Sequence, residues 1–142
     1  MLMRIPPIIS PELMKTLMEM GHGDEIVLGD GNFPAASLAK RLVRCDGHNV
    51  PELLDAILKL FPLDQHVEHP VMLMDIAPGE ARPGIWARYQ RILDRNSEES
   101  PRIKYLERFE FYERTKQAYA AVATGEMAIY ANIILKKGVV TV

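Results

Sequence analysis

A histidine and several carboxylates gather in one short stretch of the chain. His22 lies between Gly21 and Gly23, two carboxylates follow it, and Asp30 comes after a short apolar run. Histidine can donate and accept protons near neutral pH, and flanking glycines let the backbone bend sharply toward a ligand. A carboxylate at the end of a buried strand lies where α/β folds place their pockets. This pattern indicates acid–base chemistry on a small polar ligand.

Structural roles account for the same residues. His22 can cap the end of a preceding helix by bonding its last carbonyls, and Asp30 can be a plain turn former. Tyr130 and Asn132 fit an ordinary strand tyrosine and a polar residue at a strand edge, and Arg108 fits solvated surface. The residue pattern alone therefore indicates a polar cluster near Asp30 and leaves its role open.

Residue spacing argues against several other kinds of site. The glycines around His22 precede a strand and lack the third glycine of a dinucleotide-binding fingerprint, and no Gly-Lys-Ser/Thr phosphate loop is present. His66 and His69 are close together in a Pro-flanked polar loop, which we interpret as solvated surface rather than a zinc or iron site. No Gly-x-Ser-x-Gly elbow suggests a covalent nucleophile. We therefore expect neither a metal nor a cofactor.

The composition is typical of a globular protein. The 142 residues suffice for one domain with its own core, which we expect to span residues 1–142. The formal net charge of −2 provides no global field for nucleic acid or an anionic membrane, so we expect neither as a partner. Cys45 is the only cysteine, and residues 1–7 are too short an apolar run for a signal peptide. Both observations favour a cytoplasmic protein.

Apolar periodicity predicts alternating helices and strands. Helices are expected from Ser10 to Gly21 and over residues 51–61, 85–93 and 110–119. Short apolar runs predict strands over residues 25–28, 42–44, 71–76, 103–106, 120–123 and 130–135, the last two around a turn at Gly125. This alternation predicts an α/β fold, a single layered domain with a central sheet covered by helices.

Whole segments of the chain resemble one family of sugar isomerases. The first block comprises Ile-Ser-Pro-Glu-Leu at 9–13, Met-Gly-His-Gly-Asp-Glu-Ile-Val-Leu at 20–28, and Asp30 with Asn-Phe-Pro-Ala at 32–35. The second comprises Arg-Phe-Glu-Phe-Tyr-Glu-Arg at 108–114, Ala-Thr-Gly-Glu at 123–126, Tyr-Ala-Asn at 130–132 and Leu-Lys-Lys-Gly-Val at 135–139. In the same order along essentially the whole chain, these segments resemble the family of L-fucose mutarotases and D-ribose pyranases. The resemblance implies that family's fold and a cofactor-independent isomerase.

The resemblance also implies roles for individual residues. The histidine of the Gly-His segment is the family's proposed proton donor, which makes His22 the catalytic candidate. The aspartate after the first strand binds sugar, which assigns substrate binding to Asp30. The segment that closes the pocket is Tyr130, Ala131 and Asn132 in this chain.

Arg108 matches the arginine that contacts substrate in the fucose branch, where the ribose branch has a histidine. The resemblance therefore implies interconversion of the α and β anomers of L-fucose by acid–base ring opening and closure. Ala131 departs from this branch, because Tyr-Gly-Asn is usual in fucose mutarotases and Tyr-Ala-Asn in ribose pyranases. The alternatives are a D-ribose pyranase, a non-catalytic sugar-binding protein and a purely structural oligomer subunit.

The family resemblance implies an assembly as well. Bacterial relatives form pentamers that often stack in pairs as decamers, with pockets near subunit contacts. We therefore expect a homo-oligomer that acts on a free monosaccharide. The apolar last residues, 138–142, are compatible with a subunit contact.

Overall fold

The computed structural model describes residues 1–142. Helices and strands alternate along most of the chain, and the last two elements are strands. In order they are α1 (Pro11–Glu19), β1 (Glu25–Gly29), α2 (Ala35–Leu38), β2 (Leu42–Cys45), α3 (Val50–Leu58), β3 (Val71–Met74), α4 (Ile85–Arg95), β4 (Ile103–Leu106), α5 (Arg108–Gln117), β5 (Ala120–Thr124) and β6 (Ile133–Lys136). None of the helices is both long and apolar enough to cross a membrane.

The six strands form one mixed sheet in the order β2-β5-β1-β6-β3-β4. Strand β6 runs antiparallel to both of its neighbours, β1 and β3, whereas all other neighbouring pairs are parallel. The carboxyl ends of β1 to β5 and the amino end of β6 therefore share one edge, called here the carboxyl edge. The opposite edge, where β1 begins and β6 ends, is the amino edge.

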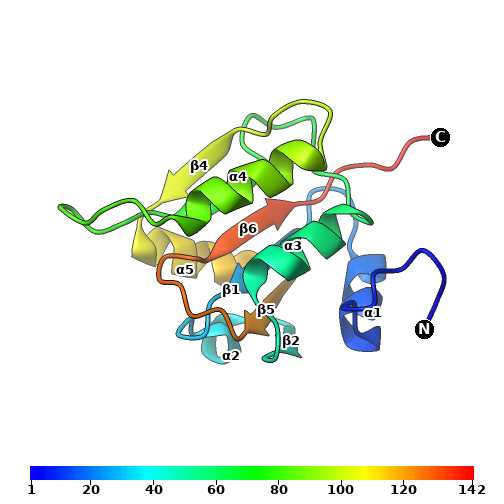
Figure 1. Cartoon of the computed structure of the whole chain (residues 1–142), viewed down its shortest axis with the longest axis horizontal. Helices are drawn as coiled ribbons and strands as arrows, with labels where there is room; N and C mark the ends of the chain where they lie inside the picture. The colour runs from blue at the N-terminus through cyan, green and yellow to red at the C-terminus, as the bar shows by residue number, and fades with distance from the viewer.

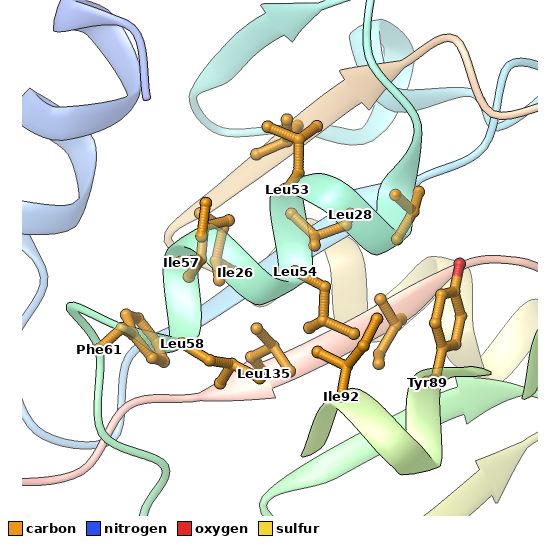
Figure 2. Packing of buried hydrophobic residues seen from close by; sticks show 14 of the residues in the cluster. Ile26, Leu28, Leu53, Leu54, Ile57, Leu58, Phe61, Tyr89, Ile92 and Leu135 are labelled. Atoms are coloured by element: carbon orange, nitrogen blue, oxygen red, sulfur yellow. The ribbon is translucent and has the colours of Figure 1, made fainter. Parts of the chain in front are cut away.

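Helices cover both faces of the sheet (Figure 1). Residues of α1, α3 and α4 pack in the larger core cluster, and residues of α2 and α5 pack in the smaller one. Strand β1 contributes Ile26 and Leu28 to the larger cluster and Val27 to the smaller one, because successive side chains of a strand point to opposite faces. Figure 2 shows Ile26, Leu28 and Leu135 beneath the apolar side chains of α3. The sheet is thus the middle layer of three, as the predicted α/β fold requires.

Every helix and strand predicted from periodicity is present, within a few residues at its ends. Helix α2 was not predicted, because it has only four residues and no apolar period of its own. The strand predicted over 130–135 begins only at Ile133, and Tyr130 has a left-handed φ of 53° that no strand adopts. Strands β5 and β6 are not neighbours around Gly125, since β1 lies between them.

Candidate active site

Five of the six predicted site residues lie at the carboxyl edge. Asp30 directly follows β1, and Arg108 begins α5 just after β4. Residues 130–132 lead into β6, whose amino end lies at the same edge. Because β6 runs antiparallel to its neighbours, the segment before it reaches the edge that Asp30 and Arg108 already share.

Asp30 is buried and held by the opposite segment. Its backbone N–H donates to Oδ1 of Asn132 at 2.7 Å, and its Oδ1 accepts from the N–H of Asn32 at 3.0 Å. The preceding Gly29 has no side chain, and a Cβ there would collide with the ring of Phe33. The Gly29–Phe33 loop thus folds tightly over the end of β1 and fixes where the carboxylate lies.

Burial makes Asp30 a stronger base than an ordinary carboxylate. Desolvation raises its pKa above 3.8, and the charge of Glu126 acts in the same direction. Backbone N–H groups of Asn32, Ala131 and Phe33 oppose this effect without cancelling it. The site therefore contains a carboxylate that accepts protons and hydrogen bonds more readily than one on the surface.

Helix α4 holds the backbone of Tyr130 and Ala131. Nε1 of Trp86 donates to the carbonyl of Tyr130 at 2.8 Å, and the hydroxyl of Tyr89 donates to the carbonyl of Ala131 at 2.6 Å. The hydroxyl of Tyr130 in turn accepts from the N–H of Ala77 at 3.3 Å. Helical spacing placed Trp86 and Tyr89 on a buried face, and their polar atoms need partners there. The need of a buried indole N–H and a buried phenol hydroxyl for hydrogen-bond acceptors could therefore have predicted that α4 bonds a neighbouring backbone segment.

Arg108 is exposed and lies against aromatic rings. Its Nε donates to the hydroxyl of Tyr112 at 3.0 Å, and its guanidinium lies 5.3 Å from the ring centroids of Phe109 and Tyr112. Tyr112 also meets Phe33 edge to face at 5.8 Å. Arg108 is thus linked through Tyr112 to the loop that carries Asp30, and its remaining N–H groups are available to a ligand.

His22 lies at the amino edge, in a tight turn after α1. The turn closes when the N–H of Gly21 donates to Oδ2 of Asp24 at 2.8 Å, and Gly23 has a φ of 87° that favours glycine. The imidazole does not cap α1. Its Nε2 lies 3.2 Å from Oδ1 of the buried Asp64, and about half of the side chain (49%) is exposed. This half-exposed imidazole can contact a ligand.

Of the two histidines predicted to be solvated surface, His66 lies next to this turn. His66 is exposed, yet its ring meets that of His22 edge to face with centroids 5.5 Å apart. His69 is partly buried. Asp64 was not predicted at all, because 42 residues separate it from His22 and no local pattern marks it. No group of three or more His, Cys, Asp or Glu side chains is arranged to hold a metal ion.

A polar depression beside the turn has an ion pair in its lining. It is lined by Gly23, Asp24, Glu25, Arg114, Gln117, Tyr119 and Lys136. At its base the buried Glu25 accepts two hydrogen bonds from Arg114, at 2.9 and 2.7 Å. This bidentate pair ties α5 to the start of β1. We therefore assign the depression a structural role and place the chemistry elsewhere.

One chain does not bring His22 and Asp30 together. The five residues of β1 lie between them, one at each end of the strand. At about 3.3 Å per residue, the strand alone separates the two ends by roughly 13 Å. All five residues of β1 are buried, so the strand offers no open surface along which one monosaccharide could contact both residues of the same chain.

Comparison with known proteins identifies the family of this chain and solved structures with the same fold. A model of the RbsD / FucU transport protein family matches residues 3–140. The chain is 52% identical to a fucose mutarotase of Mus musculus over an alignment of 141 positions, which covers 94% of this chain and 92% of that protein. The crystal structure of a fucose mutarotase in complex with L-fucose from Streptococcus pneumoniae superimposes with a TM-score of 0.96 at 56% identity, covering 99% of this chain and 100% of that one. The structure of Bacillus subtilis RbsD complexed with D-ribose is more distant, with a TM-score of 0.72 and 26% identity over 98% of this chain and 100% of that one. The chain therefore belongs to the RbsD / FucU transport protein family.

Proposed function

We propose that this chain is an L-fucose mutarotase, an isomerase that interconverts the α and β anomers of the free sugar. The observation that carries the proposal is the polar cluster at the carboxyl edge. It occurs in a chain that matches, over nearly its whole length, a fucose mutarotase crystallised with L-fucose. The cluster contains the buried Asp30, whose pKa is raised above the usual value by desolvation.

The proposed reaction needs two proton transfers and no redox step. A base removes the proton of the anomeric hydroxyl, whose electrons form the C1 carbonyl as the bond from C1 to the ring oxygen breaks. An acid protonates the released ring oxygen at the same time. Rotation about the C1–C2 bond and closure on the other face of the carbonyl give the second anomer. Each positioned proton-transfer group typically contributes about 10²–10⁴-fold to the rate.

The site residues have distinct parts in this proposal. His22 delivers or accepts a proton, because its imidazole can do both near neutral pH. Asp30 accepts hydrogen bonds from sugar hydroxyls, which its raised pKa strengthens. Arg108 donates to fixed hydroxyls with the N–H groups that Tyr112 leaves free. Tyr130 closes the pocket, and Asn132 holds the backbone of Asp30 in place.

Arg108 favours L-fucose over D-ribose as the substrate, because it matches the arginine of the fucose branch, where the ribose branch has a histidine. Ala131, the residue that resembles the ribose branch, is fully buried in the larger core cluster. Its carbonyl accepts from Tyr89 on α4. The methyl group therefore faces the core rather than a sugar, and alanine can replace glycine there without changing the sugar site.

The choice between the two sugars can be tested by anomer exchange. Saturation-transfer proton NMR on the anomeric signals would be recorded for L-fucose and for D-ribose at the same protein concentration. We expect rapid transfer between the fucose α and β signals. Transfer confined to the pyranose and furanose signals of ribose would instead assign the chain to the pyranase branch.

We further propose that the complete site forms between two copies of this chain in a homo-oligomer, such as a decamer of two stacked pentamers. His22 and Asp30 lie at opposite edges, so a head-to-tail contact can place the histidine of one copy near the aspartate of the next. Apolar residues are exposed close to both. Met127 and Ile129 (90% and 62% exposed) lie between β5 and residue 130, and Val139 and Val140 follow β6. The substrate would be a free monosaccharide of the cytoplasm.

Asp30→Asn is expected to change sugar binding and stability in opposite directions. Loss of the charged acceptor should raise KM for L-fucose about tenfold to a hundredfold. Folding raises the pKa of Asp30, so the ionised group costs stability at a pH above its folded pKa, and the neutral amide removes that cost. The sugar-free variant should therefore melt at a higher temperature at pH 7. An unchanged KM together with an unchanged kcat would contradict the assigned role.

A further inference from the structure

Asp64 is a buried carboxylate held firmly at the amino edge. Its side chain is only 3% exposed, and its backbone N–H donates to the carbonyl of Lys136 at 2.9 Å. The preceding Leu63 forms a bridge with Lys137, and the N–H of Gly138 donates to the carbonyl of Pro62 at 2.7 Å. The end of β6 therefore fixes this segment from both sides, and the carboxylate has little freedom to move.

The carboxylate faces His22 in a defined way. Its Oδ1 accepts from the backbone N–H of His66 at 2.9 Å and lies 3.2 Å from Nε2 of His22. Burial raises the pKa of Asp64, but these two hydrogen bonds and the charges of His22 and His66 together outweigh it and lower the pKa below 3.8. Asp64 is therefore ionised at neutral pH, and an ionised carboxylate can only accept hydrogen bonds. It follows that Nε2 of His22 carries a hydrogen.

The backbone around His22 is fixed independently of this contact. The N–H of Gly23 donates to the carbonyl of Lys137, and the N–H of Lys137 donates to the carbonyl of Asp24, at 2.8 and 2.9 Å. The carboxylate of Asp24 is engaged by the N–H of Gly21. The imidazole is thus carried on a rigid turn and oriented at one nitrogen. The other nitrogen, Nδ1, makes no hydrogen bond within the chain, and about half of the side chain is exposed.

We propose that Asp64 is a positioning residue that holds His22 in its Nε2–H tautomer, so that Nδ1 is the nitrogen that exchanges a proton with the sugar. This inference rests on the proposed mutarotase function. A histidine base in a proton transfer needs a fixed tautomer and ring orientation, which a buried carboxylate on the second nitrogen supplies. If Asp64 served only to accept from the N–H of His66 and close the 64–66 turn, it would not select one tautomer of His22.

The tautomer can be measured without any variant. ¹⁵N NMR of the imidazole rings distinguishes protonated from unprotonated nitrogens, and the spectrum of His22→Ala assigns the signals. We expect the neutral His22 ring of the wild-type protein to carry its hydrogen on Nε2. A ring with its hydrogen on Nδ1 would overturn the inference, whatever the kinetics show.

Asp64→Asn tests the consequence for catalysis. The amide keeps the shape and can still accept from His66, but it no longer fixes the tautomer. We expect kcat for L-fucose anomer exchange to fall about tenfold to a hundredfold, with a much smaller change in KM, and a mixture of His22 tautomers. The matched control is Asp55→Asn, which removes a carboxylate of α3 that is bonded by Lys59, Arg95 and Asn96 and makes no hydrogen bond with His22 or Asp64. It should leave kcat and the tautomer unchanged.

Different results would reject the role of Asp64 and the proposed mutarotase function. A folded Asp64→Asn protein with wild-type kcat, beside an inactive His22→Ala protein, would overturn the role of Asp64 alone. No fucose exchange by the wild-type protein would overturn the proposed function, while the tautomer would still report on the contact between Asp64 and His22. If Asp64→Asn does not fold, the wild-type tautomer measurement decides.

Discussion

His22→Ala is expected to lower kcat for L-fucose anomer exchange by about 10²–10⁴-fold, the usual contribution of one positioned proton-transfer group. KM should change far less, because the groups proposed to bind hydroxyls lie at the carboxyl edge. The side chain is half exposed and caps no helix, so the melting temperature should stay within a few degrees of the wild-type value. NMR exchange rates and thermal unfolding of the same samples would check both parts.

The matched control for this substitution is His69→Ala. It removes another histidine that takes no part in the contact between His22 and Asp64. This variant should keep wild-type kcat. A folded His22→Ala protein that exchanges fucose anomers at the wild-type rate would reject the catalytic role. It would favour the alternative of a non-catalytic sugar-binding protein, in which His22 is dispensable.

Mixing two impaired variants, His22→Ala with its low kcat and Asp30→Asn with its raised KM, is expected to restore activity at low fucose concentration. If each site takes His22 from one copy and Asp30 from another, chains carrying His22→Ala and chains carrying Asp30→Asn complement each other. In an oligomer assembled at random from equal amounts, about a quarter of the sites receive both intact residues. Co-expressed and co-purified mixtures should therefore show about a quarter of the wild-type rate at low fucose concentration, well above either variant alone.

The control for complementation uses a chain that carries both substitutions. Co-assembled with His22→Ala chains, the double variant supplies no intact histidine to any site, so this mixture should remain inactive. Restoration in the first mixture but not in the second would establish a site shared between copies. Absence of restoration in a mixture shown to co-assemble would place both residues in one chain and contradict the head-to-tail arrangement.

The local parts of the fold were predictable because they depend on local spacing. Ser10 accepts from the N–H of Leu13 and begins α1 as its sequence indicates, and the apolar runs of β1 and β3 lie in the sheet. The order of the strands was not predictable. The insertion of β6 between β1 and β3 depends on packing among distant segments, and no residue period records it.

The same distinction applies to the candidate site. Family resemblance and residue type singled out His22 and Asp30, and the strand predicted over residues 25–28 lies between them, but residue types alone did not show that the two side chains end at opposite edges of a buried sheet. Asp64 escaped notice because a single aspartate before a polar loop resembles many others. Its burial and its contact with His22 exist only once β6 has paired with β1 and β3. Long-range pairing therefore decides which polar residues meet.

Catalysis of L-fucose anomer exchange by this protein can be observed directly on the signals of the sugar. Saturating the anomeric proton signal of one fucose anomer by NMR should diminish the signal of the other once catalytic amounts of the protein are added. Without protein, the spontaneous exchange is too slow to transfer saturation. Transfer that depends on the protein is the predicted result. If the two signals stay independent at every protein concentration, the protein is not a fucose mutarotase.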